Sequence, residues 1–374
     1  MRTDVNPLSS PVRPGWSALV DRSRRLLREV QDGSGAWPAA PDFAPYGFSW
    51  FRDGSFIAEG ASAAGLHDEA AGFHAWCAAV LRREEPAVDR VVAALAAGER
   101  LEDSDYLPAR YTLAGERHED DWWNFQVDGY GTWMWALERH LGRTGEPVTP
   151  YADAVEIAVR YLVATGRDTC RDWWEENRDQ THVATLAGVA AGLRAAVRLG
   201  CLAAPLARRA EATADAAEAD ILNGGVQGGR LTKWLGGSDV DASLLSVAAL
   251  YDVLPVDHPL VTATVAQVRT LLTRGGVHRY TADTFYGGGQ WPVLASLLAW
   301  HEARSGNLEE AAALLDWVVS VADDDLLLPE QAAPMLAPEI LDEWLERWGP
   351  SAHPLVWSHG MFLGAVAQVE LARG

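Results

Sequence analysis

Apolar residues recur with the period of an α-helix along almost the whole chain. Two runs follow the i, i+3, i+4, i+7 spacing closely: Val183, Leu186, Ala187, Ala190, Leu193 and Val197, and Leu308, Ala312, Leu315, Val318, Val319 and Ala322. Alternation of apolar and polar residues is scarce, and no Asn-Gly turn joins two β-branched runs. The pattern therefore predicts an all-α protein built from amphipathic helices.

The predicted helices are joined by connections that alternate between short and long. We expect about twelve main helices, over residues 16–30, 53–64, 68–83, 129–141, 151–165, 181–199, 204–221, 241–251, 259–273, 291–304, 308–322 and 357–371, and a further helix near 87–98. The short connections are 65–67, 142–150, 200–203, 252–257 and 304–307, and the long ones are 31–52, 84–128, 166–180, 222–240, 274–290 and 323–356. If successive helices run up and down around a ring, all the long loops emerge at the same end. The sequence thus predicts a barrel of six inner and six outer helices with one elaborated face, on which function is usually carried.

The length of 374 residues is compatible with one large domain or two average ones. No proline- or serine-rich linker marks a second domain. We therefore expect residues 1–374 to form a single domain, with residues 1–14 as an extended N-terminal arm.

The composition excludes some classes of partner. A net charge of -21 argues against a nucleic acid or an anionic membrane, because phosphate contacts require clustered Lys and Arg. No run of about 18 apolar residues predicts a membrane helix. The 17 tryptophans are many for a soluble protein and indicate a surface that binds a ligand, for which a neutral molecule is the easier fit.

The cysteines and the N-terminal residues give indications of the cellular compartment of the protein. Cys77, Cys170 and Cys201 are odd in number and show neither CxxC nor metal-type spacing, which predicts reduced thiols in a cytoplasmic protein. Residues 1–14 contain no apolar segment of the kind found in secretory signals. The sequence does not determine the oligomeric state.

The stretch DWWEENR, residues 172–178, places two adjacent carboxylates beside two indoles. A carboxyl group packed against apolar rings has its charged form disfavoured, so its pKa rises and it can serve as a general acid. Glu330, in the LPEQ stretch at 328–331, lies on another long loop and offers a complementary base. We expect Glu175 and Glu330 to face each other across one pocket. The alternative is a helix start whose acidic residues favour the helix dipole.

Three further stretches on the long loops combine aromatic and polar residues. In YGFSWFRD at 46–53, Arg52 offers a rigid fork of donors and Asp53 offers acceptors, a set that suits the hydroxyls of a sugar ring. The same pair could be a simple ion pair at a helix start. DWWNFQVDGY at 121–130 also mixes polar groups with rings, although aromatic packing explains it as well. The stretch LTKW at 231–234 is only a weak indication of a binding site.

The glycine triplet in RYTADTFYGGG at 279–289 could suggest a phosphate loop. No Lys-Ser/Thr follows it and no strand precedes it, so we reject that interpretation. The chain also lacks an HExxH motif, an EF-hand loop and a Cys/His cluster, and we expect neither a metal nor another cofactor. The acidic runs at 119–121 and 323–325 are more typical of solvated loops.

Taken in order, these stretches resemble the motifs of a known enzyme family. The matching segments are Tyr46 to Asp53 (Y-x-x-x-W-x-R-D), Gln126 to Gly131 (Q-x-D-x-x-G), Trp174-Glu175, Val240 to Ser243, Arg279 to Gly288, Pro329 to Gln331, and Pro354 to His359 (P-L-x-W-x-H). They are similar to those of the glucoamylase-type inverting glycosidases, glycoside hydrolase family 15, which includes glucodextranases, bacterial trehalases and isomaltose glucohydrolases. The resemblance covers nearly the whole chain in order.

This resemblance implies an (α/α)6-barrel catalytic domain with Glu175 as general acid and Glu330 as general base. The expected substrate-binding residues are Tyr46, Trp50, Arg52, Asp53, Trp174, Glu176 and Arg279. Arg52 and Asp53 would hold the outermost glucose and make the action exo, while Glu176 would contact the leaving sugar. In an inverting enzyme the two carboxyl groups stand about 6.5–9.5 Å apart to leave room for water.

Several functions remain open on the sequence alone. The LPEQ form resembles dextran-acting members, so we expect release of β-glucose from short α-1,6 glucosides of the isomaltose type. The alternatives are α-1,4 glucoamylase activity, trehalase activity, a non-catalytic sugar-binding or regulatory barrel, and a sugar epimerase on the same fold. A terpene cyclase would need an Asp-Asp-x-x-Asp cluster, which the sequence lacks.

Overall fold

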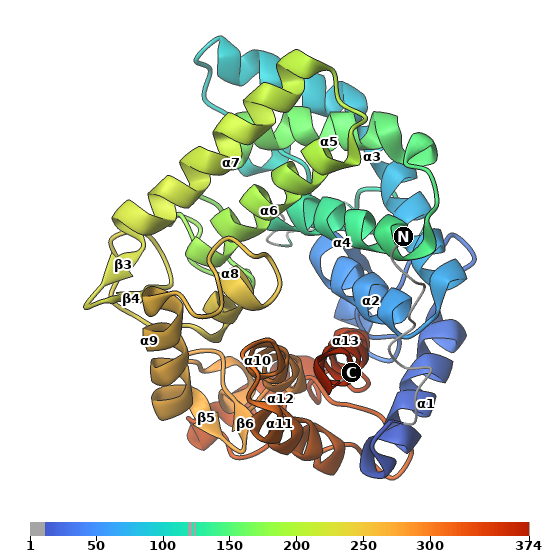
Figure 1. Cartoon of the computed structure of the whole chain (residues 1–374), viewed down its shortest axis with the longest axis vertical. Coiled ribbons are helices and arrows are strands. Elements are labelled where there is room, and N and C mark those ends of the chain that lie inside the picture. Colours follow the sequence, from blue (N-terminus) through green and yellow to red (C-terminus); the bar gives the residue numbers. More distant parts are fainter. Residues whose placement is uncertain (1–11, 119–121, 123–124, 374) are drawn as a thin grey trace.

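The protein is a closed ring of helices, seen end-on in Figure 1. The computed structural model describes residues 12–118, 122 and 125–373. Six helices form the inner wall: α2 (Phe51–Ala63), α4 (Asp128–Thr144), α6 (Val183–Leu199), α8 (Ser246–Ala249), α10 (Pro292–Arg304) and α13 (Val356–Arg373). Each packs against the next in this order, and α13 closes the ring against α2.

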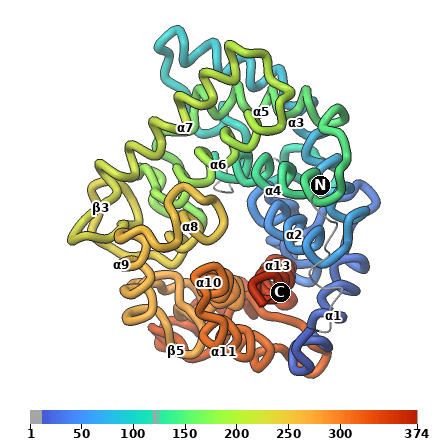
Figure 2. The backbone as a smooth tube through the Cα atoms, in the orientation of Figure 1, coloured from blue at the N-terminus to red at the C-terminus, as the bar shows by residue number. Residues whose placement is uncertain are grey.

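An outer layer surrounds this wall. It consists of α1 (Pro14–Val30), α3 (His67–Ala96), α5 (Ala152–Thr165), α7 (Ala204–Gly224), α9 (Pro259–Gln267) and α11 (Leu308–Ser320). The chain alternates between the layers and passes once around the ring, as the colour gradient in Figure 2 shows. The (α/α)6 barrel expected from the periodicity is confirmed.

The inner helices are more buried than the outer ones, because the outer helices have one side in contact with solvent. Every residue of α2 is buried, since this helix is covered by neighbours on all sides. The outer helix α7 buries only one stripe, formed by Ala210, Ala214, Ala217 and Ile221. Spacings of three and four residues put these side chains on one face of the helix, as expected for an element with one solvated side.

The connections also follow the predicted alternation. Links from an inner to the next outer helix are short, whereas those from an outer to the next inner helix are long and include three two-stranded antiparallel sheets. The strand pairs are β1 (Ser49–Trp50) with β2 (Arg110–Tyr111), β3 (Val226–Gln227) with β4 (Arg230–Leu231), and β5 (Thr273–Arg274) with β6 (Gly276–Val277). The short helical turns are η2 (Ala44–Tyr46), η3 (Asp103–Asp105), η4 (Thr149–Tyr151), η5 (Ala242–Leu245), η6 (Val268–Leu272), η7 (Phe285–Gly287) and η8 (Pro338–Ile340).

The structure differs from the predicted elements in three regions. The helices expected at 68–83 and 87–98 form one continuous helix, α3, with Pro86 inside it, because Leu81, Val88 and Val91 continue one buried face past the proline. The helix expected at 241–251 is reduced to η5 and the short α8. An additional helix, α12 (Leu341–Trp348), lies within the predicted loop 323–356.

Helices α4 and α6 approach each other closely through glycines. A Cβ atom at Gly192 would lie 2.3 Å from the carbonyl oxygen of Gly131, a backbone atom that cannot move aside on its own. We expect Gly192→Ala to lower the free energy of unfolding by roughly 1–3 kcal/mol, as overpacking does. Urea denaturation measures this change.

The matched control for this prediction is Gly142→Ala on α4, whereas Gly192 itself lies on α6. A Cβ atom at Gly142 would meet nothing within 4 Å. Alanine there should be neutral or stabilise by up to about 1 kcal/mol, because it has the higher helix propensity. Equal losses in both variants would contradict the close contact at Gly192.

None of the helices in the described ranges is long and apolar enough to cross a membrane.

Candidate active site

A cavity of about 490 Å³ is formed by the long loops, which meet at the same end of the barrel. This volume lies in the range of sites for small molecules. All nine residues that the sequence singled out line it: Tyr46, Trp50, Arg52, Asp53, Trp174, Glu175, Glu176, Arg279 and Glu330. The ring therefore brings together, in one pocket, residues from four loops.

The backbone around Glu175 forms a tight turn. Glu175 has a φ of 65°, in the left-handed region that residues with a Cβ adopt at a cost. The turn is closed by two backbone hydrogen bonds, from the Glu175 N–H to the Asp172 carbonyl and from the Asp172 N–H to the Glu176 carbonyl, each 3.0 Å long. The Asp172 carboxylate also accepts the N–H groups of Trp174 and Glu176, each at 2.9 Å. Asp172 thus holds the conformation that directs Glu175 into the cavity.

The Glu175 carboxylate accepts three N–H groups from two other loops. Trp50 Nε1 and Gln126 Nε2 donate to Oε1 at 2.8 and 2.9 Å, and Trp122 Nε1 donates to Oε2 at 2.8 Å. Since all three partners are donors, they suit a carboxylate that carries a negative charge.

This environment differs from the one expected from the sequence. Trp174 was expected to shield Glu175 with its ring, but its Nε1 donates instead to Asp241 at 2.9 Å. The predicted apolar environment of Glu175 is wrong, because the indoles of Trp50 and Trp122 meet its carboxylate through their polar N–H groups. These donors lie far from Glu175 in the sequence.

Glu330 occupies a different environment on the loop before α13. Its side chain is buried, and burial raises the pKa of its carboxyl group to about 8, while a hydrogen bond from the Tyr46 hydroxyl and the charge of Arg279 act in the opposite direction. The Glu330 N–H donates to the Ala352 carbonyl at 2.9 Å. Together with His359, whose Nε2 accepts the Leu328 N–H at 2.9 Å, this contact fixes the loop to the end of the barrel.

The raised pKa of Glu330 predicts a pH dependence of stability. The folded protein keeps the Glu330 proton up to a pH of about 8, whereas the unfolded chain loses it near the ordinary value of 4.5. Between these values the folded state binds more protons, so the contribution of Glu330 to stability falls as the pH rises. Glu330→Gln has no such proton to lose. We expect its Tm minus that of the wild type to increase steadily as the pH is raised through this window, measured by calorimetry.

The control for this prediction is Glu339→Gln, which neutralises an exposed carboxylate nine positions further along the chain. Its Tm difference should stay constant over the same pH range. A constant difference for Glu330→Gln as well would contradict the raised pKa.

Arg52 and Asp53 form a buried polar group at the start of α2, with residues 4% and 8% exposed. Arg52 Nη1 donates to Gln126 Oε1 at 2.6 Å and pairs with Asp128 Oδ2 at 3.4 Å. Arg52 Nε lies 3.3 Å from Asp53 Oδ1, yet neither atom has a hydrogen-bond partner among the described residues. Burial raises the pKa of Asp53 to about 6, and Arg52 opposes this shift. This is more than the simple helix-start ion pair that the sequence also allowed.

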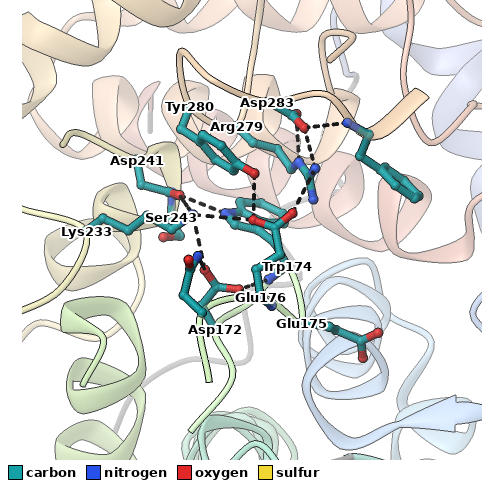
Figure 3. A network of polar contacts seen from close by, with 12 residues as sticks. Asp172, Trp174, Glu175, Glu176, Lys233, Asp241, Ser243, Arg279, Tyr280 and Asp283 are labelled. Carbon is teal, nitrogen blue, oxygen red and sulfur yellow. Dashed lines mark hydrogen bonds and ion pairs between the residues drawn. The ribbon is translucent and has the colours of Figure 1, made fainter. Parts of the chain in front are cut away.

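Arg279 and Glu176 also line the cavity, and Figure 3 shows them in one polar network. Arg279 forms two hydrogen bonds with Asp283, and its Nη2 lies 3.5 Å from Glu176 Oε1. The Tyr280 hydroxyl donates to Glu176 Oε2 at 2.6 Å. Glu176 is therefore held by neighbours on both of its oxygens.

Several residues of the site were not singled out from the sequence. Gln126 joins Arg52 to Glu175, although only its motif had been noted. Trp344 and Trp348 of α12 also line the cavity, and Trp344 stacks on Tyr286 with 5.5 Å between the ring centroids. The apolar residues of α12 stand at 341, 344, 345 and 348, a helical spacing that would have revealed this helix.

Parts of the predicted motifs lie outside the described residues. These are Asp121, Trp123 and Asn124 of the stretch 121–130, the acidic run at 119–121, and most of the N-terminal arm. In the remainder of the chain, the structure shows no group of three or more His, Cys, Asp or Glu side chains that could hold a metal ion.

Comparison with known proteins shows extensive similarity. The family described as Glycosyl hydrolases family 15 matches residues 14–321. The chain is 41% identical over 349 residues to the isomaltose glucohydrolase of Kribbella flavida, a match that covers 92% of this chain and 91% of that protein.

Solved structures are similar in the same way. A wild-type glycosidase and a glycosidase variant in complex with glucose each match with a TM-score of 0.93 and 40% identity, over 96% of this chain and 97% of theirs. The glucoamylase of Saccharomycopsis fibuligera matches with a TM-score of 0.74 over 97% of both chains, at 14% identity, and so shares the fold.

Proposed function

Because the chain belongs to family 15 of the glycosyl hydrolases, we propose that it cleaves the α-1,6 bond of isomaltose-type glucosides from the non-reducing end and releases β-glucose. The observation that carries this proposal is the cavity itself, which is lined by two carboxylates from distant loops and by the buried Arg52–Asp53 pair. Such a site has the groups needed to protonate a leaving oxygen, activate a water molecule and hold a sugar.

In this mechanism Glu175 is the general acid. It gives its proton to the glycosidic oxygen while the bond from that oxygen to C1 of the glucose breaks. The N–H groups of Trp50, Trp122 and Gln126 then stabilise the carboxylate that remains, since hydrogen bonds to a charged acceptor are stronger than those to a neutral one. Three donors therefore favour the state of Glu175 that exists after proton transfer.

Glu330 is the general base. It takes a proton from the water molecule that attacks C1 from the opposite face of the ring, so that the glucose is released as the β anomer. Burial raises the pKa of Glu330 to about 8, so the base acts in those molecules in which Glu330 is ionised. The hydrogen bond from the Tyr46 hydroxyl and the charge of Arg279 favour that ionised form.

The proposal that the enzyme acts on chain ends is supported by the burial of Arg52 and Asp53. Both residues are buried although they line the cavity, so a glucose ring that contacts them has no path onward past them. A polymer could therefore enter only by its end. The choice of the α-1,6 linkage is supported by the 41% identity to an isomaltose glucohydrolase.

Proton NMR of the anomeric region tests the proposal directly. Fresh enzyme is added to isomaltose, maltose and trehalose in parallel, and the first glucose to appear is assigned as α or β. We expect β-glucose, released fastest from isomaltose. Early α-glucose would overturn the inverting mechanism, faster release from maltose or trehalose would overturn the linkage, and no glucose from any substrate would favour a non-catalytic barrel.

A further inference from the structure

Lys233 is the only lysine among the 31 lysine and arginine residues of the chain. It follows β4, and its backbone is fixed on both sides: its N–H donates to the Asp239 carbonyl at 2.8 Å, and its carbonyl accepts the Val183 N–H at the start of α6 at 3.1 Å. Its side chain is only 4% exposed. A buried ammonium group requires partners, because burial without them disfavours its charge.

The partners of Lys233 are three carboxylates from two segments of the chain (Figure 3). Its Nζ lies 3.2 Å from Asp172 Oδ2, 3.2 Å from Asp241 Oδ2 and 3.7 Å from Glu176 Oε2. The ring of Tyr280 covers it, with 3.7 Å from Nζ to the ring centroid. Although burial acts to lower it, the three carboxylates raise the pKa of Lys233 above its ordinary value.

This arrangement suits lysine rather than arginine. The three carboxylates converge on one point, and an ammonium group is a compact charge with three donors that can point in different directions. A guanidinium group is planar and longer, and it is best matched to one carboxylate at a time. The use of lysine here, in a chain that uses arginine at every other basic position, is consistent with this demand.

Each carboxylate that contacts Lys233 is connected to the residues next to Glu175. Asp172 accepts the N–H groups of Trp174 and Glu176 and so closes the turn in which Glu175 has its positive φ. Asp241 accepts the indole N–H of Trp174. In Figure 3 the Glu175 carboxylate points away from this network. Lys233 therefore holds the chain on both sides of Glu175 through the carboxylates of Asp172 and Glu176.

We propose that Lys233 is a positioning residue for the general acid: by pairing with the carboxylates of Asp172, Glu176 and Asp241 it fixes the turn that aims Glu175 at the glycosidic oxygen. This inference rests on the function proposed above. Without the ammonium group, the buried carboxylates of Asp172 and Asp241 and the half-buried one of Glu176 repel one another at short range, and the turn relaxes. The acid then loses its alignment, while the loop that carries Glu330 is untouched.

The test compares a substrate that needs the acid with one that does not. Isomaltose requires protonation of its leaving oxygen. In α-glucosyl fluoride the C1–F bond breaks to release fluoride without a proton from an acid, while water bonds to C1 and gives its proton to Glu330. We expect Lys233→Met to lower kcat on isomaltose about 10²-fold, the effect of a misplacement of about 1 Å, and to retain most of kcat on α-glucosyl fluoride.

The matched control is Arg269→Met. It also removes a cation from a buried carboxylate, since Arg269 Nη2 lies 2.9 Å from Glu302 Oε1, but it does so away from the cavity lining. Its effects on the two substrates should be equal. If Lys233→Met does not fold, Asp172→Asn weakens the same link from its other end while leaving Lys233 paired with Asp241, and it should show the same difference between substrates.

The outcomes separate the two proposals. Parallel losses on both substrates, or no loss on either, would show that Lys233 does not position the acid, although the hydrolytic function would stand. If the wild-type protein released glucose from neither substrate, the proposed function would fail and the role of Lys233 with it. If Lys233→Met loses isomaltose hydrolysis but keeps α-glucosyl fluoride hydrolysis, the result supports both the hydrolytic function and the role of Lys233.

Discussion

Glu175→Gln should reduce kcat on isomaltose by about 10²–10⁴-fold, the usual contribution of a general acid. The glutamine keeps the size of the side chain and an oxygen that can accept the N–H groups of Trp50 or Trp122, but it has no proton to give to the leaving oxygen. The loss should be much smaller on α-glucosyl fluoride, whose leaving group needs no proton. Steady-state kinetics on both substrates, with a thermal melt of the variant, measure the effect.

The control for this variant is Asp179→Asn, an exposed carboxylate on the same loop, which should leave both activities near the wild-type values. A loss of α-glucosyl fluoride hydrolysis as large as that of isomaltose would mean that Glu175 does more than donate a proton. Unchanged isomaltose hydrolysis would remove Glu175 from the reaction altogether.

Removing the Glu330 carboxylate should lower kcat by a similar factor, but on both substrates and not on isomaltose alone. In Glu330→Ala no carboxylate is left to activate water, so kcat should fall by about 10²–10⁴-fold on both isomaltose and α-glucosyl fluoride. Azide is a nucleophile that needs no deprotonation, and the smaller side chain leaves space for it. We expect added azide to restore turnover of α-glucosyl fluoride with β-glucosyl azide as the product, identified by NMR.

Glu339→Ala, at an exposed position in the same long connection between α11 and α13, is the control and should hydrolyse both substrates without azide. Two results would contradict the role of Glu330 as base. One is an α-glucosyl azide product, which would indicate a covalent intermediate and hence a retaining mechanism. The other is a loss confined to isomaltose, the pattern expected of the acid.

The (α/α)6 barrel could be predicted because its signals are local. The spacing of apolar residues within one helix determines which face is buried, and the alternation of short and long connections determines on which end the loops gather. The nine expected site residues follow from motifs that lie on those loops, and all of them line the cavity. The departures in secondary structure, such as the continuous α3, arise where packing overrides a local signal like Pro86.

The surroundings of each carboxylate could not be predicted in the same way. Trp50 and Glu175 are 125 positions apart, and Gln126 and Glu175 are 49 apart, so no local pattern indicates that they meet. The sequence led us to expect an apolar surrounding for Glu175, whereas the structure surrounds it with N–H donors and instead buries Glu330.

Lys233 shows most clearly the difference between what the sequence predicts and what the tertiary structure adds. The stretch LTKW carries almost no signal of its own, and its importance comes from Asp172, Glu176 and Asp241. The sequence by itself determined most of the helices and the barrel, because these depend on spacing along one segment, and its resemblance to the family motifs indicated nine residues of the site. Only the tertiary structure decided which charges and donors face each carboxylate, because electrostatic interactions depend on distances in space between segments that the closed ring brings together.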